Sequence, residues 1–162
     1  MTPDNAALAD HTSMPTERAF LPLHAWPEVV RHARRFVAAA VVGFPYDPYD
    51  IALIASELTT NAVRTAMAMR TWPDDMFPIG VEVTVTERYA HVAVTDPNPG
   101  PMPASARGGL LAQGGRGLVI VDQHALARWA TYADDGKTVH VVVMASGVLL
   151  TDDELKRIGV PQ

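Results

Sequence analysis

Two stretches in the first seventy residues carry apolar positions every three or four residues, the spacing of one helix face. The first is opened by Pro27 and ended by Gly43. The second starts with Asp47 and Pro48, a pair typical of a helix N-terminus, and stops before Pro73. Its apolar stripe consists of Ile51, Ala55, Leu58, Ala62 and Ala66. The pattern therefore predicts two amphipathic helices that share a core.

Alternating apolar and polar residues mark the strands. Residues 79–87 and 89–96 alternate on either side of Glu87 and Arg88, which predicts a hairpin with a tight turn. Residues 127–132 and 138–144 predict a second hairpin, turned at 134–136. Residues 17–24 are expected to form an edge strand, because Pro22 has no N–H for a central ladder.

The order of these elements indicates an α+β fold, a two-layer sandwich with helices on one face of a mixed, mainly antiparallel sheet. A long proline-rich loop follows residue 96, and Gly115 opens a short apolar helix after it. We expect residues 1–16 to be a flexible tail, 17–146 to be one domain, and 147–162 to be a C-terminal tail. That tail should hold a short helix, since Thr151 and Glu154 have the spacing of a capping box.

Composition narrows the class of protein. At 162 residues the chain can bury the core of one domain. A net charge of −5 without a basic cluster argues against nucleic acid as a direct partner. The absence of cysteine excludes disulfides and thiolate metal sites, and no apolar run reaches membrane-spanning length. We expect a soluble, cytoplasmic protein with no membrane partner.

Three positions along the chain are candidates for chemistry. Glu57, Asn61 and Arg64 share one stripe of the second helix, Asp96 ends a strand, and Gly115-Arg116-Gly117 precedes a helix. Each also has a plainer interpretation. Polar residues at this spacing occur on any solvated helix face, aspartate before proline often forms a turn, and Gly-Arg-Gly is common where a loop meets a helix.

Together, the three positions suit a nucleotide. The amide oxygen of Asn61 is a hard ligand suited to Mg²⁺, and Glu57 can accept a proton from an attacking hydroxyl. A buried Asp96 can accept a hydrogen bond from an adenine amino group. Glycines at a helix start let backbone N–H groups approach phosphates.

The sequence resembles the GHKL (Bergerat-fold) superfamily of ATP-binding domains, which includes gyrase and the histidine kinases. Within it, the chain looks most like the small bacterial anti-sigma factor serine/threonine kinases. Three phrases carry the resemblance, which covers residues 17–145: S-E-L-T-T-N-A-V-R, G-G-R-G-L-V-I-V-D and D-G-K-T-V. The first glycine box departs from the usual pattern, because it reads Asp96-Pro97-Asn98-Pro99-Gly100 and keeps only its second glycine.

The resemblance implies ATP and Mg²⁺ as cofactors and gives each residue a role. Glu57 would be the catalytic base, Asn61 the metal ligand, and Asp96 the reader of adenine. The remaining nucleotide-binding positions would be Arg64, Gly100, Gly115, Arg116, Gly117, Leu118 and Thr138. Of these, Gly115, Gly117 and Leu118 would frame the triphosphate, Arg116 would approach the terminal phosphate, and Thr138 would support the adenine pocket beside Asp96.

The implied function is phosphorylation of an anti-anti-sigma (STAS-type) partner, with a sigma factor as another partner and a homodimer as a possible state. Two alternatives stay open. The chain could bind nucleotide and sequester a partner without phosphotransfer, which the altered first glycine box favours. It could also scaffold a signalling complex with its pocket empty. The intact Glu57 and Asn61 favour catalysis.

Overall fold

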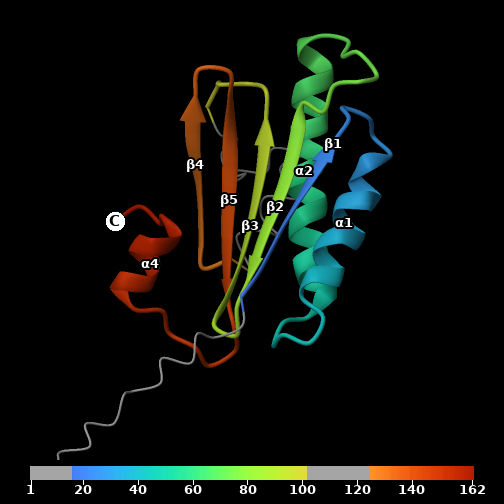
Figure 1. Cartoon of the computed structure of the whole chain (residues 1–162). Helices are drawn as coiled ribbons and strands as arrows, with labels where there is room; N and C mark the ends of the chain where they lie inside the picture. Colours follow the sequence, from blue (N-terminus) through green and yellow to red (C-terminus); the bar gives the residue numbers. More distant parts are fainter. Residues whose placement is uncertain (1–15, 102–124) are drawn as a thin grey trace, which may run out of the picture.

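Five strands form a single antiparallel sheet in the computed structural model, which describes residues 16–101 and 125–162 (Figure 1). The sheet order is β1-β2-β3-β5-β4. The strands are β1 (Glu17–Leu23), β2 (Ile79–Val85), β3 (Tyr89–Asp96), β4 (Ala127–Ala133) and β5 (Gly136–Met144). The helices are α1 (Val29–Ala40), α2 (Pro48–Met69) and α4 (Asp152–Ile158).

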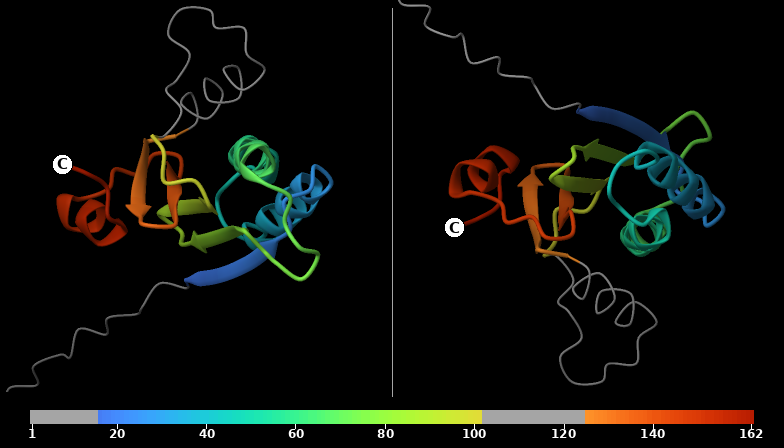
Figure 2. Two further views of the ribbon diagram at one scale, coloured as in Figure 1. Left: turned by 90° about the horizontal axis from the view of Figure 1, so that it is seen from above. Right: turned by 90° about the horizontal axis from the view of Figure 1, so that it is seen from below.

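The views in Figure 2 show α1 and α2 side by side on one face of the sheet, and α4 on the opposite side, next to β4. Helix α2 packs mainly on β3 and β2, whereas α1 packs on β1 and β2. The predicted α+β sandwich is thus confirmed. The prediction of a mixed sheet needs correction, because every pair of neighbouring strands in the described chain is antiparallel.

Helix α2 begins as the sequence predicts. The Asp47 side chain accepts a hydrogen bond from the backbone N–H of Tyr49 at 2.8 Å, and Pro48 occupies the first turn, where its missing N–H costs nothing. Near its other end, the indole Nε1 of Trp72 donates to the carbonyl of Ala66 at 2.9 Å. Because carbonyls in the last turn of a helix have no partner within it, this bond helps to fix where α2 stops.

The core lies between the two helices and the inner face of the sheet. Alternate residues of β2 and β3 point into it, as the period of two requires, and meet the apolar stripe of α2. The largest fully buried side chains are Ile51, Ile54, Ile79, Val37, Val41, Val81, Val83, Val85, Val92, Val94 and Val141. Burial of each such side chain contributes roughly 1.5–3 kcal/mol. The core therefore holds α2 rigidly against the central strands.

Strand β5 begins earlier than the sequence suggested. The predicted hairpin starts its second strand at Thr138, but the ladder already pairs Ala133 with Gly136, leaving a two-residue turn of Asp134 and Asp135. Gly136, which was predicted to lie in the turn, and Lys137 therefore both belong to the strand. In the β3–β5 register Lys137 lies directly opposite Asp96.

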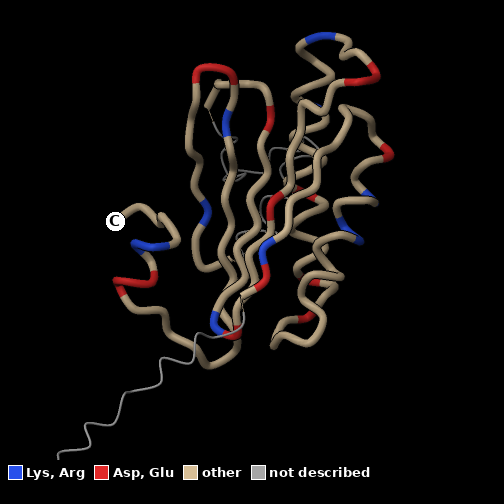
Figure 3. The backbone as a smooth tube through the Cα atoms, in the orientation of Figure 1, with Lys and Arg blue, Asp and Glu red and all other residues tan. Residues whose placement is uncertain are grey.

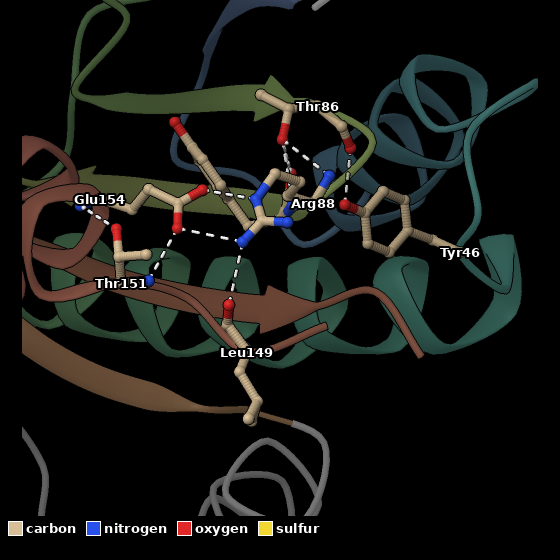
Figure 4. Close-up of polar contacts among 7 residues, drawn as sticks. Tyr46, Thr86, Arg88, Leu149, Thr151 and Glu154 are labelled. Atoms are coloured by element: carbon tan, nitrogen blue, oxygen red, sulfur yellow. Dashed lines mark hydrogen bonds and ion pairs between the residues drawn. The ribbon is translucent and has the colours of Figure 1, made fainter. Parts of the chain in front are cut away.

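A polar clasp joins the C-terminal segment to the β2–β3 turn (Figure 4). The guanidinium of Arg88 donates to both carboxylate oxygens of Glu154, at 2.5 and 3.1 Å, and to the carbonyl of Leu149 at 2.9 Å. Glu154 and Thr151 form the predicted capping box at the start of α4. Since α4 has no buried residue, this clasp is its main described attachment.

Charged residues of both signs are interspersed over the described chain (Figure 3). The β4–β5 turn is acidic through Asp134 and Asp135, while α1 exposes Arg31, Arg34 and Arg35. Within residues 16–101 and 125–162, no helix combines the length and apolarity needed to cross a membrane.

The clasp predicts an acid-sensitive contribution to stability. Hydrogen bonds from Arg88 and the capping box lower the pKa of Glu154 from 4.5 to about 2. The stabilisation is then complete above pH 4.5 and is lost as the pH falls toward 2. Urea unfolding should show Glu154→Gln less stable than wild type at pH 7, with the difference shrinking between pH 4.5 and 3. Glu87→Gln, an exposed carboxylate on the same turn, is the matched control. A pH-independent difference for Glu154→Gln would contradict the clasp.

Candidate nucleotide site

Helix α2 presents the first group of predicted site residues. Glu57 and Asn61 are half-buried and Arg64 is exposed, each on the side of the helix away from the core stripe. Among the described residues, neither Glu57 nor Asn61 has a hydrogen-bond partner for its side chain. Because α2 is fixed by its core, these side chains project from a rigid support and remain available to a ligand.

Asp96 ends β3 on the inner face of the sheet and is only 4% exposed. Its carboxylate is paired with the ammonium of Lys137, which is also 4% exposed. The Lys137 Nζ lies 3.2 Å from Oδ1 and 3.1 Å from Oδ2. A buried carboxylate is costly unless it is paired and hydrogen-bonded, so the two residues stabilise each other's charge.

Two side chains order the start of the loop after β3. Asp96 Oδ1 accepts from the backbone N–H of Asn98 at 2.8 Å, and Asn98 Oδ1 accepts from the N–H of Gly100 at 2.8 Å. The carbonyl of Asn98 in turn accepts from Lys137 Nζ at 3.2 Å. These bonds form two successive Asx turns. The turns hold the backbone in place where the usual first glycine would leave it flexible. They also use backbone N–H groups that could otherwise face a ligand.

Asp96 and Lys137 open onto a cavity of about 570 Å³. This volume lies within the range of small-molecule sites. The cavity combines aromatic and aliphatic walls with a few polar groups, and Arg70 stacks over the ring of Trp72 at 3.9 Å. Its lining residues are Met69, Arg70, Trp72, Met76, Phe77, Pro78, Thr95, Asp96, Pro97, Thr131, Tyr132, Ala133, Asp135, Gly136, Lys137 and Thr138. A flat, partly polar ring such as a purine suits these walls.

Thr138 borders the cavity, but its hydroxyl is placed differently from the expectation. The residue alternates with Lys137 along β5, so its side chain belongs to the outer face, where it shares a 2.7 Å hydrogen bond with Thr95. The neighbour of Asp96 is thus Lys137, which lies between the predicted turn at 134–136 and the predicted strand at 138–144. The signal that could have found it is the register: Lys137 lies opposite Asp96 once the turn is shortened to two residues.

Arg64 is separated from the Asp96 cavity. It borders a second cavity of about 460 Å³ in the groove between α1 and α2, together with Pro27, Val30, Thr60, Val63 and Met67. The four positions Gly115, Arg116, Gly117 and Leu118 lie outside the described residues, and their roles stay predictions. In the described part of the chain no cluster of three His, Asp or Glu could hold a metal ion.

The outer face of the sheet carries a separate histidine cluster. His91 Nε2 lies 3.0 Å from His140 Nδ1, and His140 Nε2 lies 2.9 Å from the hydroxyl of Thr131. Trp129 stacks on both rings. Burial, followed by repulsion from His140, lowers the pKa of His91 to about 4, and burial also lowers the pKa of His140. Both rings are neutral near pH 7, so the cluster acts as packing on the outer face of the sheet.

A helix-covered sheet has a buried carboxylate at the end of one of its inner strands, and this carboxylate opens to a cavity of the size of small-molecule sites. The family of histidine kinase-like ATPase domains matches residues 23–145, and the chain belongs to this family. Membership implies an ATP site.

Among solved structures, the chain is similar to the structure of the RsbU and RsbW domains of Rv1364c from Mycobacterium tuberculosis. The two share 17% sequence identity at a TM-score of 0.54, over 85% of this chain and 35% of that one. The likeness shows a common fold, and this chain spans only about a third of the other. No curated protein sequence matches the chain closely enough to be a relative.

The approach of β5 to Asp96 gives a prediction about Gly136. A Cβ at this position would lie 2.3 Å from the carbonyl oxygen of Asp96, so Gly136→Ala must push the two strands apart at the cavity. Such overpacking costs about 1–3 kcal/mol, which urea unfolding would detect. Gly80→Ala is the control, because its Cβ would meet only the exposed ring of Phe20, which can rotate away. Equal stability losses in the two variants would contradict a close backbone contact at Asp96.

Proposed function

We propose that this chain is a Mg-ATP-dependent serine/threonine kinase of the anti-sigma type, acting on a small anti-anti-sigma (STAS-type) protein. The observation that carries the proposal is the buried Asp96 carboxylate at the mouth of the 570 Å³ cavity. Family membership and the sequence resemblance to anti-sigma kinases support it. A sigma factor is the other protein that such a domain would hold.

In this proposal, Asp96 recognises the base. A carboxylate has about four acceptor sites, and here Oδ1 takes two contacts while Oδ2 takes one. Oδ2 therefore keeps capacity to accept from the amino group of adenine. An analogue without that donor would leave the buried oxygen unpaired, which sites of this kind reject strongly.

In this proposal, Glu57 and Asn61 of α2 act on the phosphates. Asn61 would hold Mg²⁺ through its amide oxygen, and the bound cation would offset the charge of the phosphates. Glu57, one helical turn earlier, would accept the proton of the partner's hydroxyl as that oxygen attacks the terminal phosphorus and ADP leaves. We also propose that Arg64, Gly100, Gly115, Arg116, Gly117, Leu118 and Thr138 contribute to nucleotide binding.

A second candidate function is a nucleotide-binding module that sequesters its partner without phosphotransfer. The Asx turns favour it, because the N–H groups of Asn98 and Gly100 are already bonded within the loop. Fewer free backbone donors would mean weaker contacts with the phosphates. Glu57 separates the two functions, since only a kinase needs a proton acceptor.

Substitutions on α2 test the choice. Glu57→Ala should bind Mg-ATP and partner as wild type does, yet transfer phosphate about 10²–10⁴-fold more slowly, because it lacks the proton acceptor. Asn61→Ala should lose Mg²⁺-dependent ATP binding as well as transfer. Glu28→Ala, an exposed carboxylate just before α1, is the matched control and should leave both unchanged.

Transfer is read by mass spectrometry of the partner, and ATP affinity by calorimetry. Equal transfer by wild type and Glu57→Ala would refute Glu57 as the base. Bound ATP and bound partner without transfer by wild type would establish the module instead.

A further inference from the structure

We propose that Lys137 is a specificity-determining residue of the nucleotide site: it pairs with the Asp96 carboxylate and orients it, so that the cavity accepts adenine and rejects a 6-oxopurine. The inference rests on the proposed nucleotide site. It gives a role to a residue that lies within the D-G-K-T-V phrase but to which the resemblance assigns none.

Geometry shows that Lys137 acts through Asp96. An ammonium has three N–H donors, and Lys137 Nζ faces three acceptors: Asp96 Oδ1 at 3.2 Å, Asp96 Oδ2 at 3.1 Å and the Asn98 carbonyl at 3.2 Å. Its donors are thus fully used within the protein. Lys137 is a positioning residue, and the free acceptor capacity that meets the base lies on Asp96.

Because both side chains are buried, the loss of Lys137 would change how Asp96 hydrogen-bonds to a base. With both side chains about as buried as the core, a carboxylate without a cation would favour its neutral, protonated form. A protonated Asp96 is a donor, which suits the 6-oxo group of hypoxanthine and opposes the amino group of adenine. Lys137 thereby sets which hydrogen-bonding character the cavity presents to the base.

Other charged and titratable groups that line the cavity do not substitute for Lys137. Arg70 is exposed and stacks on Trp72, while Tyr132 and Asp135 are exposed near the β4–β5 turn. Lys137 contacts both carboxylate oxygens of Asp96, whereas the Arg70 guanidinium lies over the Trp72 ring. Arg70→Met therefore offers a matched control that removes a cation from the same cavity.

The test compares wild type, Lys137→Met, Arg70→Met and the double variant Asp96→Asn/Lys137→Met. Calorimetry at pH 6 and pH 8.5 measures the affinities for Mg-ATP and Mg-ITP, whose bases differ at the 6-position. Wild type and Arg70→Met should prefer ATP equally at both pH values. Lys137→Met should lose about tenfold or more of this preference at pH 6 and regain part of it at pH 8.5, as Asp96 ionises.

Unfolding of the nucleotide-free proteins is the second measurement. In Lys137→Met the folded state binds the Asp96 proton more tightly than the unfolded state, so its stability should fall as the pH rises from 5 to 9. Wild type and the double variant, which has no buried carboxyl at this position, should lack this trend.

The outcomes separate the two claims. A wild type that binds neither nucleotide would overturn the proposed function, while the unfolding profiles would still report the Lys137–Asp96 coupling. A Lys137→Met protein that keeps its ATP preference at pH 6, or that weakens both nucleotides equally at both pH values, would overturn the role of Lys137. A Lys137→Met unfolding profile parallel to that of wild type would do the same.

Discussion

The antiparallel register of β3 and β5 is the constraint on which this end of the molecule depends. It places Lys137 opposite Asp96, on the inner face, where both side chains are withdrawn from water. Gly136 precedes Lys137 and lets the two backbones come closer than any Cβ would allow. A slip of β5 by one residue would turn Lys137 to the outer face and bring Thr138 to the inner face beside Asp96. The pairing of β3 with β5 thus determines which polar side chains line the cavity.

In the proposed nucleotide site, two parts of the fold would serve two separate tasks. The end of β3 supplies a buried, fixed carboxylate, while α2 supplies half-exposed polar groups from a helix held by its apolar stripe. Burial suits recognition of the base, because an unsatisfied hydrogen bond is costly there. Partial exposure suits the phosphate side, where a hydrated cation and a partner's hydroxyl must enter. The Asx turns after Asp96 order the start of the loop that follows β3.

Much of this arrangement could be predicted because local patterns determine it. Asp47 and Pro48 fix the start of α2, alternation reveals the β2–β3 hairpin, and Thr151 with Glu154 marks α4. What the sequence could not supply were pairings between distant residues. The Arg88–Glu154 clasp joins positions 66 residues apart, and the Lys137–Asp96 pair joins positions 41 apart. Turn length mattered most: the predicted β4–β5 turn included Gly136 and the predicted strand began only at Thr138, so the pairing of Lys137 with Asp96 was missed.

A crystal structure of the protein with Mg-ADP tests the central claim most directly, because it locates the base. The account predicts the adenine amino group within about 3.2 Å of the Asp96 carboxylate, with the Lys137–Asp96 pair intact and Mg²⁺ on the amide oxygen of Asn61. Adenine bound in the α1–α2 groove beside Arg64, or anywhere away from Asp96, would contradict it.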